Sequence, residues 1–253
     1  MAISTLREAA PALRSDPRAA LTRCAWILAD EGHESGLAGQ LTARGPDEGT
    51  FWTLPLGLAF DEADEASWLL IDDAMKVLAG DGSYGIREPN PATRFHLWVY
   101  RARPDVQAIV HTHPPATSVL AAAEQPLVVA HMDATPLFDD MAFLPDWPGL
   151  PTADREGELI AGGLGTKHAR LLAHHGLLAA GRRVAEAAFL AVFIERMARL
   201  QVDASPLGGV KPVDAGEARR ARDFLRTDRI MDATFDAWSR RAARRRGRVG
   251  GAA

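Results

Sequence analysis

The sequence predicts one α/β domain with antiparallel strands, and three observations support this prediction. The chain has 253 residues, of which 47% are hydrophobic and 25% charged, so it is long enough and apolar enough to bury a large core. Short apolar runs rich in β-branched residues alternate with longer runs of helical period. No internal repeat and no linker-like stretch divides the chain, so we expect residues 1–253 to form a single domain.

The first predicted helix spans residues 18–32. Asp16 offers a capping oxygen ahead of it, Pro17 suits a first helical turn, and Gly32 ends the apolar pattern. Cys24 lies within this pattern and is expected in the core. Because it is the only cysteine of the chain, an intrachain disulfide and a cysteine-rich metal site are excluded.

Two short strands are predicted next, over residues 51–57 and 67–72. The acidic turn at 61–66 separates them, which indicates antiparallel pairing. A glycine-punctuated segment at 33–46 precedes them, and no strand is assigned to it.

The middle of the chain predicts a helix, a strand and a second helix in direct succession. Residues 92–105 have helical periodicity that ends at Pro104, residues 106–113 are apolar and β-branched, and residues 114–125 start with two prolines. The buried stripe of the helix at 92–105 is expected to contain Phe95, Val99 and Ala102.

The second half of the chain predicts further strands and long helices. Residues 127–151 mix a short strand with a proline-rich, aromatic loop, residues 169–181 predict a strand pair, and residues 184–204 predict a long helix. From Asp214 onward the chain is charged and helical in character, and its last ten residues are expected to be disordered. The arginine-rich stretch 240–248 is predicted to be a solvated terminus, with an anionic partner as the alternative.

Charge and hydropathy point to small-molecule chemistry. The net charge is −4, from 29 basic and 33 acidic residues, so no nucleic-acid partner and no anionic membrane surface is expected. No run approaches the roughly 20 apolar residues of a membrane helix, and the first residues lack the apolar core of a secretory signal. A cytoplasmic location is therefore expected.

Histidines at the ends of two predicted strands indicate a metal site. His111 and His113 are two residues apart, so a strand places both imidazoles on one face, although such a pair can also cap a strand without a metal. His174 and His175 end the next apolar strand ahead of Gly176, and only one of the two can point into the same site. Three neutral imidazoles with an open position suit a catalytic Zn, Mn, Co or Fe ion.

The stretches RARPDVQAIVHTHPP and LLAHHGLLAAG resemble the class II aldolase/adducin family, and the resemblance covers roughly residues 18 to 205. It implies that His111, His113 and His175 hold one divalent metal ion per subunit. It also implies a three-layer α/β/α sandwich with a central, mostly antiparallel sheet. Members of the family are commonly tetramers with active sites at subunit contacts, so a homo-oligomer, with a tetramer favoured, is expected.

Two departures from the family pattern concern its phosphate-binding segments. Sugar-phosphate aldolases of the family carry Pro-Ser-Ser-Glu, where the serines bind phosphate and the glutamate transfers protons; here the segment is Pro89-Asn90-Pro91-Ala92. The family's Ser-Gly-Asn-x-Ser segment is only partly matched, by residues 38–42. An unphosphorylated substrate is therefore expected, and another group must transfer the proton.

Several residues are candidates for contact with the substrate. His96 and His174 are the candidate catalytic groups, with the alternative that either is an ordinary hydrogen-bonded histidine. Guanidinium groups near the site could pair with a substrate carboxylate, which makes three arginines candidates. These are Arg44, Arg87 and Arg94.

His131 belongs to a loop that also carries Asp133 and several aromatic residues. Such a loop could line a pocket for a flat ring or could simply cover the core. The aromatic residues are Phe138, Phe143 and Trp147, followed by Pro148.

The preferred function is a metal-dependent decarboxylase of a small hydroxy-substituted, aromatic carboxylate. The chain resembles the family branch that contains non-oxidative decarboxylases of aromatic hydroxy-dicarboxylates, and Ala92 fits a reaction that needs no acid for an aldehyde leaving group. Three alternatives remain. They are an aldolase for an unphosphorylated carbonyl compound, a non-haem iron oxygenase, and an adducin-like binding module without catalysis.

Overall fold

One eight-stranded sheet forms the centre of the molecule, in the order β4-β3-β2-β1-β5-β8-β7-β6. A computed structural model describes residues 16–147, 149 and 154–249. Neighbouring strands are antiparallel except β6 and β7, which are parallel. The strands are β1 (Gln40–Arg44), β2 (Thr50–Thr53), β3 (Leu69–Asp72), β4 (Val77–Ala79), β5 (Ala108–Thr112), β6 (Met141–Leu144), β7 (Ala169–Leu172) and β8 (Leu177–Gly181).

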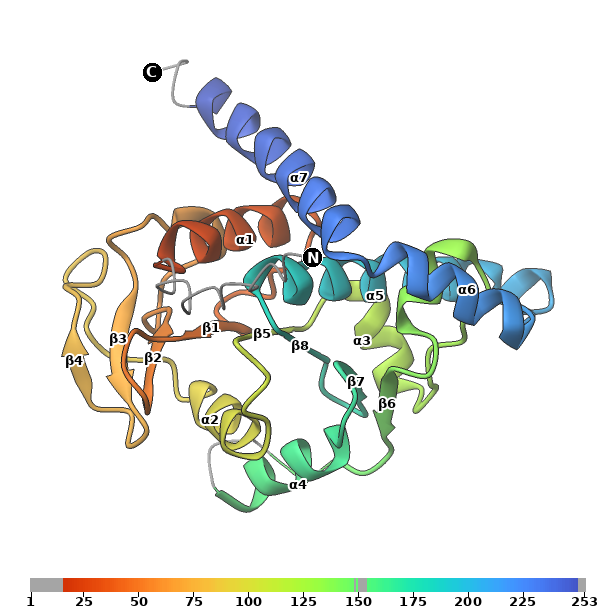
Figure 1. Ribbon diagram of the computed structural model, residues 1–253, viewed down its shortest axis with the longest axis horizontal. Helices are drawn as coiled ribbons and strands as arrows, with labels where there is room; N and C mark the ends of the chain where they lie inside the picture. Colours follow the sequence, from red (N-terminus) through yellow and green to blue (C-terminus); the bar gives the residue numbers. More distant parts are fainter. Residues whose placement is uncertain (1–15, 148, 150–153, 250–253) are drawn as a thin grey trace, which may run out of the picture.

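Helices cover both faces of this sheet, which confirms the three-layer α/β/α sandwich (Figure 1). On one face lie α1 (Arg18–Asp30), α5 (Val184–Ala204) and α7 (Asp228–Val249), and on the other lie α2 (Thr93–Ala102) and α4 (Asp154–Leu164). Two further helices, α3 (Pro115–Ala122) and α6 (Ala215–Leu225), pack on α5 and on the short 3-10 helix η2 (Met132–Leu137) respectively. The other 3-10 helices are η1 (Phe60–Glu62) and η3 (Ser205–Leu207).

The two cores follow from the alternation of side chains along each strand. In β5, Val110 belongs to the core under α1, α5 and α7, while its neighbour Ile109 belongs to the core under α2 and α4. Both side chains are almost fully buried, as is Cys24, which confirms Cys24 as a core residue. Because both faces of β5 are covered, the strand is apolar until its end.

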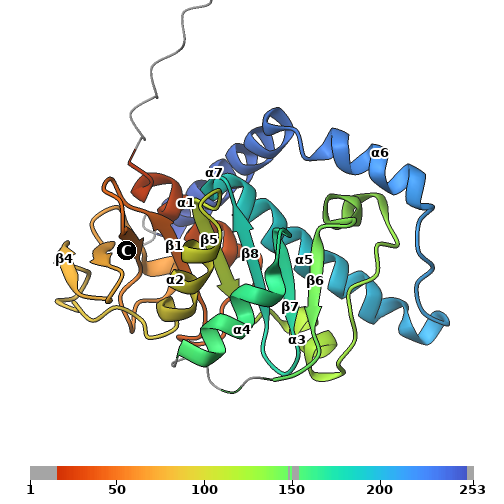
Figure 2. The same ribbon diagram turned by 60° about the horizontal axis from the view of Figure 1, so that its bottom comes forward.

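The register of the central strands brings three chain segments to one end of the sheet (Figure 2). Gln40, at the start of β1, lies opposite His111 of β5, and Thr112 lies opposite Leu177 at the start of β8. The end of β5 and the starts of β1 and β8 therefore meet at the same edge. Both histidine-containing segments are at this edge.

Most predicted elements agree with the structure, with three corrections. The segment 33–46 contains β1, a strand that pairs on both sides. Ala102 is exposed, because the helix ends there, whereas Phe95 and Val99 are buried as predicted. Helix α7 continues to Val249, so the chain is helical over most of the stretch expected to be disordered.

Besides β1, the strand β4 and the helix α4 were not predicted. Pro148, which belongs to the aromatic loop, lies outside the described residues. Among the helices of the described ranges, none combines the length and the apolar character that a membrane crossing requires.

Candidate metal centre

Three histidines converge at the edge of the sheet where β5 ends and β8 begins. One ring nitrogen from each of His111, His113 and His175 can be chosen so that all three lie within 4.8 Å of one another. The Nε2 atoms of His111 and His113 are 3.0 Å apart, and the ring of His175 lies 4.7 Å and 4.6 Å from theirs, centroid to centroid. This spacing suits three ligands of one cation.

Hydrogen bonding and burial keep these imidazoles in the form that binds a metal. His111 Nδ1 lies 2.8 Å from the carbonyl oxygen of Leu177, and since a carbonyl only accepts, Nδ1 carries the hydrogen and Nε2 keeps its lone pair. Burial, followed by the neighbouring histidines, holds the pKa of His111 well below its usual value. Burial also lowers the pKa of His113 and, together with His113, lowers the pKa of His175 to about 4.

A buried nitrogen without a partner supports the assignment. Among the described residues, none hydrogen-bonds to Nδ1 of His175, although this atom is buried. An unsatisfied buried polar atom costs about 1–3 kcal/mol, and a cation near this cluster would use the lone pair of a neutral imidazole. The three histidines therefore fit a divalent metal.

Gly176 allows the β7–β8 turn to approach β5. A Cβ atom at this position would lie 2.4 Å from the carbonyl oxygen of Thr112 and 2.5 Å from Cδ2 of His113. Both distances are too short for any side chain. The glycine after the second histidine pair is thus required by the close packing of the two metal-binding segments.

His96, a predicted catalytic residue, lies behind His111 in the core. Its Nδ1 is 2.9 Å from Oγ1 of Thr42, its ring centroid is 6.3 Å from that of His111, and its side chain is fully buried. Burial lowers the pKa of His96 to about 3, so the ring is neutral at pH 7. A role of His96 in proton transfer stays a prediction.

His174 turns toward the end of α3. It adopts a positive φ of 54°, and its Nε2 lies 2.9 Å from Oε1 of Glu124. It is not one of the three clustered histidines, in agreement with the expectation that only one of the pair points into the site. His131 caps η2, where its Nδ1 accepts a hydrogen bond from the amide of Asp133, and no described contact joins it to the three histidines.

The candidate arginines are placed differently from one another. Arg44 is four residues from Gln40, so it lies about 13 Å along β1 from the residue that pairs with His111. Its guanidinium donates to the carbonyl oxygens of Tyr100, Val106 and Arg103. The structure therefore gives Arg44 a structural position and does not bring it to the metal centre.

Arg94 and Arg87 lie on the surface. Arg94 is 3.5 Å from Asp154 of α4, and Arg87 is exposed in the loop before α2. Within the described part of the chain, Arg87 has no hydrogen bond or ion pair. Their role in substrate binding stays a prediction.

Glu195, a buried carboxylate that contacts the chain just after His113, was not predicted from the sequence. Its Oε1 accepts a hydrogen bond from the amide of Ala116, and its Oε2 accepts bonds from the amide and hydroxyl of Thr117. Glu195 thus caps the start of α3, whose first residue, Pro115, lies two residues after His113. The only sequence signal is a carboxylate on the apolar face of a long helix.

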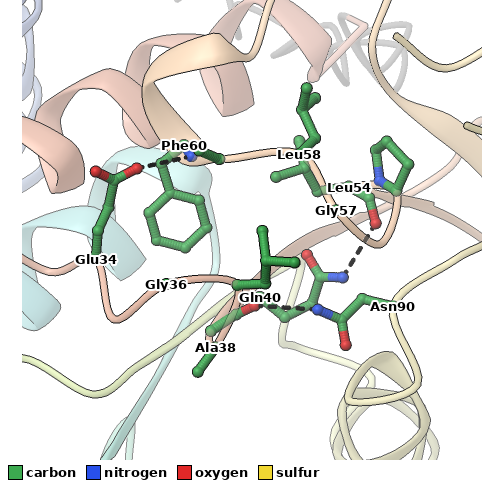
Figure 3. A pocket seen from close by; sticks show the side chains of 13 residues that line it. Glu34, Gly36, Ala38, Gln40, Leu54, Gly57, Leu58, Phe60 and Asn90 are labelled. Atoms are coloured by element: carbon green, nitrogen blue, oxygen red, sulfur yellow. Dashed lines mark hydrogen bonds between the residues drawn. The ribbon is translucent and has the colours of Figure 1, made fainter. Parts of the chain in front are cut away.

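The two segments aligned with the family's phosphate-binding motifs meet in one pocket next to this centre (Figure 3). Gly39, Gln40 and Asn90 line this pocket, and Asn90 Nδ2 lies 3.5 Å from the carbonyl oxygen of Gly39. Glu34 also lines the pocket, and its carboxylate was not recognised in the sequence. We call this cavity the Glu34 pocket.

Comparisons with known proteins agree with this geometry. The chain is 32% identical over 188 residues to a 4-hydroxy-3-prenylphenylpyruvate oxygenase/4-hydroxy-3-prenylbenzoate synthase of Streptomyces roseochromogenus, covering 74% of this chain and 66% of that protein. It is 31% identical over 188 residues to the decarboxylase NovR of Streptomyces niveus, covering 74% of this chain and 68% of that protein. The match thus leaves about a third of each relative uncovered.

The fold is also shared with solved structures. An L-fuculose 1-phosphate aldolase from Glaciozyma antarctica superimposes with a TM-score of 0.83 at 27% identity, over 91% of this chain and 90% of that one. The family model described as the class II aldolase and adducin N-terminal domain matches residues 19–202. The chain therefore belongs to the class II aldolase and adducin N-terminal domain family.

Proposed function

We propose that this protein is a metal-dependent carbon–carbon lyase that decarboxylates a small, unphosphorylated, hydroxy-substituted aromatic carboxylate. The observation that carries the proposal is the cluster of three neutral histidines without a carboxylate at the family's acid/base position. A divalent metal, when bound, polarises a substrate oxygen and stabilises the negative charge that develops as the carboxylate leaves. The protein's own side chains must orient the substrate and supply the proton.

The start of α2 distinguishes decarboxylation from aldol cleavage. Ala92 occupies the position of the family's glutamate, and its amide donates to Oδ1 of Asn90. Aldol cleavage needs a group to move the hydroxyl proton of the substrate, whereas decarboxylation needs only a donor to the carbon that loses carbon dioxide. The absence of a carboxylate side chain at residue 92 therefore favours decarboxylation.

The polar side chains around the start of α2 form a buried hydrogen-bond network, and none of them is a proton-transfer group. Gln40 donates to the carbonyl oxygen of Leu54 and to Oγ1 of Thr93, and Thr93 also contacts the hydroxyl of Thr53. This buried network fixes the first turn of α2 against β1 and β2. It gives the pocket a rigid polar wall, which suits orientation of a small substrate.

The relatives' names support this proposal and a second candidate. One relative is called a decarboxylase, and another an oxygenase that acts on a hydroxylated aromatic pyruvate. A non-haem iron oxygenase is therefore the second candidate. The aldolase alternative has support from the likeness to L-fuculose 1-phosphate aldolase but lacks the proton-transferring carboxylate.

Metal analysis combined with gas measurements tests the proposal. Purified protein should contain one divalent metal per chain, release carbon dioxide from members of a panel of hydroxylated aromatic carboxylates, and consume no oxygen. Oxygen uptake would establish the oxygenase instead, and cleavage to an aldehyde or a pyruvate-like product without carbon dioxide would establish the aldolase. If the protein binds no metal after reconstitution, the remaining alternative is an adducin-like binding module without catalysis.

A matched pair of histidine variants tests the ligands themselves. His113→Ala should lose the metal, while His131→Ala, an exposed histidine outside the cluster, should keep it. Retention of one metal per chain by His113→Ala would contradict the ligand assignment. The cytoplasmic location and the tetramer expected from the family remain proposals, and sedimentation analysis tests the tetramer.

A further inference from the structure

We propose that Glu34 determines substrate specificity, because its carboxylate excludes a phosphate group from the Glu34 pocket and accepts a hydrogen bond from a substrate hydroxyl. This inference rests on the proposed function, since it concerns the part of the substrate remote from the metal.

The Glu34 pocket lies directly beside the metal centre. A Cβ atom on Gly39 would be 3.1 Å from the carbonyl oxygen of His111, and Gln40 lies opposite His111 in the sheet. On the other side of Glu34, His33 Nδ1 is 2.9 Å from Oγ1 of Thr112. Both ends of the loop that carries Glu34 are therefore fastened to the end of β5, which contains His111 and is followed directly by His113.

One carboxylate oxygen of Glu34 is available to a ligand. Oε1 accepts a hydrogen bond from the amide of Phe60, at 2.9 Å (Figure 3), and another from the amide of Asp61, at 3.3 Å. These two bonds hold the side chain in place. In the ranges that the structure describes, Oε2 has no hydrogen-bond partner. The side chain is thus anchored by one oxygen and presents the other.

The other polar groups of the pocket do not offset this negative charge. Gln40 uses both amide hydrogens on Leu54 and Thr93, and Asn90 uses its Oδ1 on the amide of Ala92. No lysine, arginine or histidine is found among the residues that line the pocket. Phosphate sites in proteins supply several N–H donors or cations, so this pocket opposes a phosphate.

The small size of the pocket also opposes the binding of a phosphate group. The cavity has a volume of about 10 Å³. A volume of this order holds about one water-sized group, which is enough for a hydroxyl and too small for a phosphate. A hydroxyl that donates to Oε2 of Glu34 would satisfy the available oxygen.

Two hydroxy acids that differ by one phosphate provide the test. Glycerate and 3-phosphoglycerate share the hydroxy-carboxylate that binds a metal, and only the second carries a phosphate at its far end. Binding of each to the Zn²⁺-loaded protein is measured by calorimetry. Wild type should bind glycerate at least about tenfold more tightly, since a like charge in the pocket acts against the phosphate.

Variants of Glu34 isolate the charge. Glu34→Gln removes the charge at constant size and should reduce the preference for glycerate at least about fivefold, whereas Glu34→Asp keeps the charge and should keep the preference. The matched control is Glu62→Gln, because Glu62 also accepts a bond from a loop amide, that of Ala59, but does not line the pocket. Its preference should equal that of wild type.

Three results would overturn the inference: an equal or tighter binding of 3-phosphoglycerate to wild type, an unchanged preference in Glu34→Gln, or no binding of either acid to the metal-loaded protein. Each measurement is of binding, so it is independent of which reaction the protein catalyses. Failure of the decarboxylase assay with a preference that depends on Glu34 would reject the proposed function and leave this inference standing.

Discussion

Nδ1 of His33 lies 2.9 Å from Oγ1 of Thr112, the residue between two of the three clustered histidines. His33 lies three residues after the last residue of α1 and is fully buried. The bond therefore joins the end of the first helix to the metal-binding strand. It also places an ionisable ring where water does not reach.

His33 should make the metal-free protein less stable in acid. Burial, and then the charge of Arg196, lowers the pKa of His33 to about 3, while an unfolded histidine has a pKa of about 6.5. Between these values the unfolded chain binds one more proton than the folded chain, so stability falls as the pH drops below 6.5. At pH 5 the loss from this residue should be about 2 kcal/mol.

Urea unfolding of chelator-treated protein at pH 7.5 and pH 5.0 measures this loss. His33→Asn can keep the bond to Thr112 and cannot titrate. The fall in the free energy of unfolding between the two pH values should be about 2 kcal/mol smaller in the variant than in wild type. An equal fall in both proteins would show that His33 is not held neutral.

A methyl group at Gly176 should disturb the metal centre. In Gly176→Ala the new Cβ would meet the carbonyl oxygen of Thr112 and the ring of His113, so the turn must move away from β5. We expect metal affinity to fall about 10- to 100-fold and stability to fall by about 1–3 kcal/mol. Equilibrium competition with a metal-binding dye and thermal unfolding measure the two effects.

The control for this prediction is Gly162→Ala. Gly162 lies inside α4, and a Cβ atom there meets nothing within 4 Å. Alanine should stabilise the helix by about 0.5–1 kcal/mol and leave metal affinity unchanged. If the two variants bind metal equally well, the close approach at Gly176 is unimportant for the centre.

The sequence predicted the elements that have strong local patterns. Residues 184–204 form α5 as expected, since an apolar stripe and good helix formers agree there. The strand β1 was missed because glycines surround it and its residues Gln40 and Thr42 are polar. Both are buried, and their side chains bond to partners in α2. Such long-range bonds have no local signal.

The residues of the site also differ in how far their signals are local. His111, His113 and His175 were found because histidines that end apolar strands form a pattern that the family shares. Glu34 and Glu195 were missed because their partners lie 26 and 79 residues away, at Phe60 and Ala116 respectively. Arg44 was expected at the site because it follows a family motif, but along a strand four residues are enough to carry a side chain away from it.

Glu195 should hold α3 in place behind His113. In Glu195→Gln one oxygen becomes an amide group, so at least one of the three hydrogen bonds to Ala116 and Thr117 is lost. A buried donor left without a partner costs about 1–3 kcal/mol. Metal affinity should fall as well, because Pro114 links this helix start directly to His113.

Arg199→Ala provides the comparison for Glu195. Arg199 is 3.9 Å from Glu195 but is more than half exposed, so the pair is weak. This variant should stay within about 0.5 kcal/mol of wild type and keep its metal affinity. A loss in Arg199→Ala as large as that in Glu195→Gln would indicate that the ion pair, rather than the helix cap, matters.

Arg44 should contribute to stability and not to substrate binding. Its guanidinium donates to the carbonyl oxygens of Tyr100 and Arg103 at the end of α2 and of Val106 before β5, so it joins the helix end to the sheet. Arg44→Ala leaves these carbonyls without that donor and should lower the free energy of unfolding by about 2–3 kcal/mol. Below the unfolding temperature of the variant, its metal-loaded form should bind glycerate as tightly as wild type does. Weaker glycerate binding in Arg44→Ala at unchanged stability would instead indicate that Arg44 contacts the substrate.

Arg87→Ala should show the opposite pattern if Arg87 is the residue that binds a substrate carboxylate. Because Arg87 is exposed and has no described partner, the variant should keep the stability of wild type and bind glycerate more weakly.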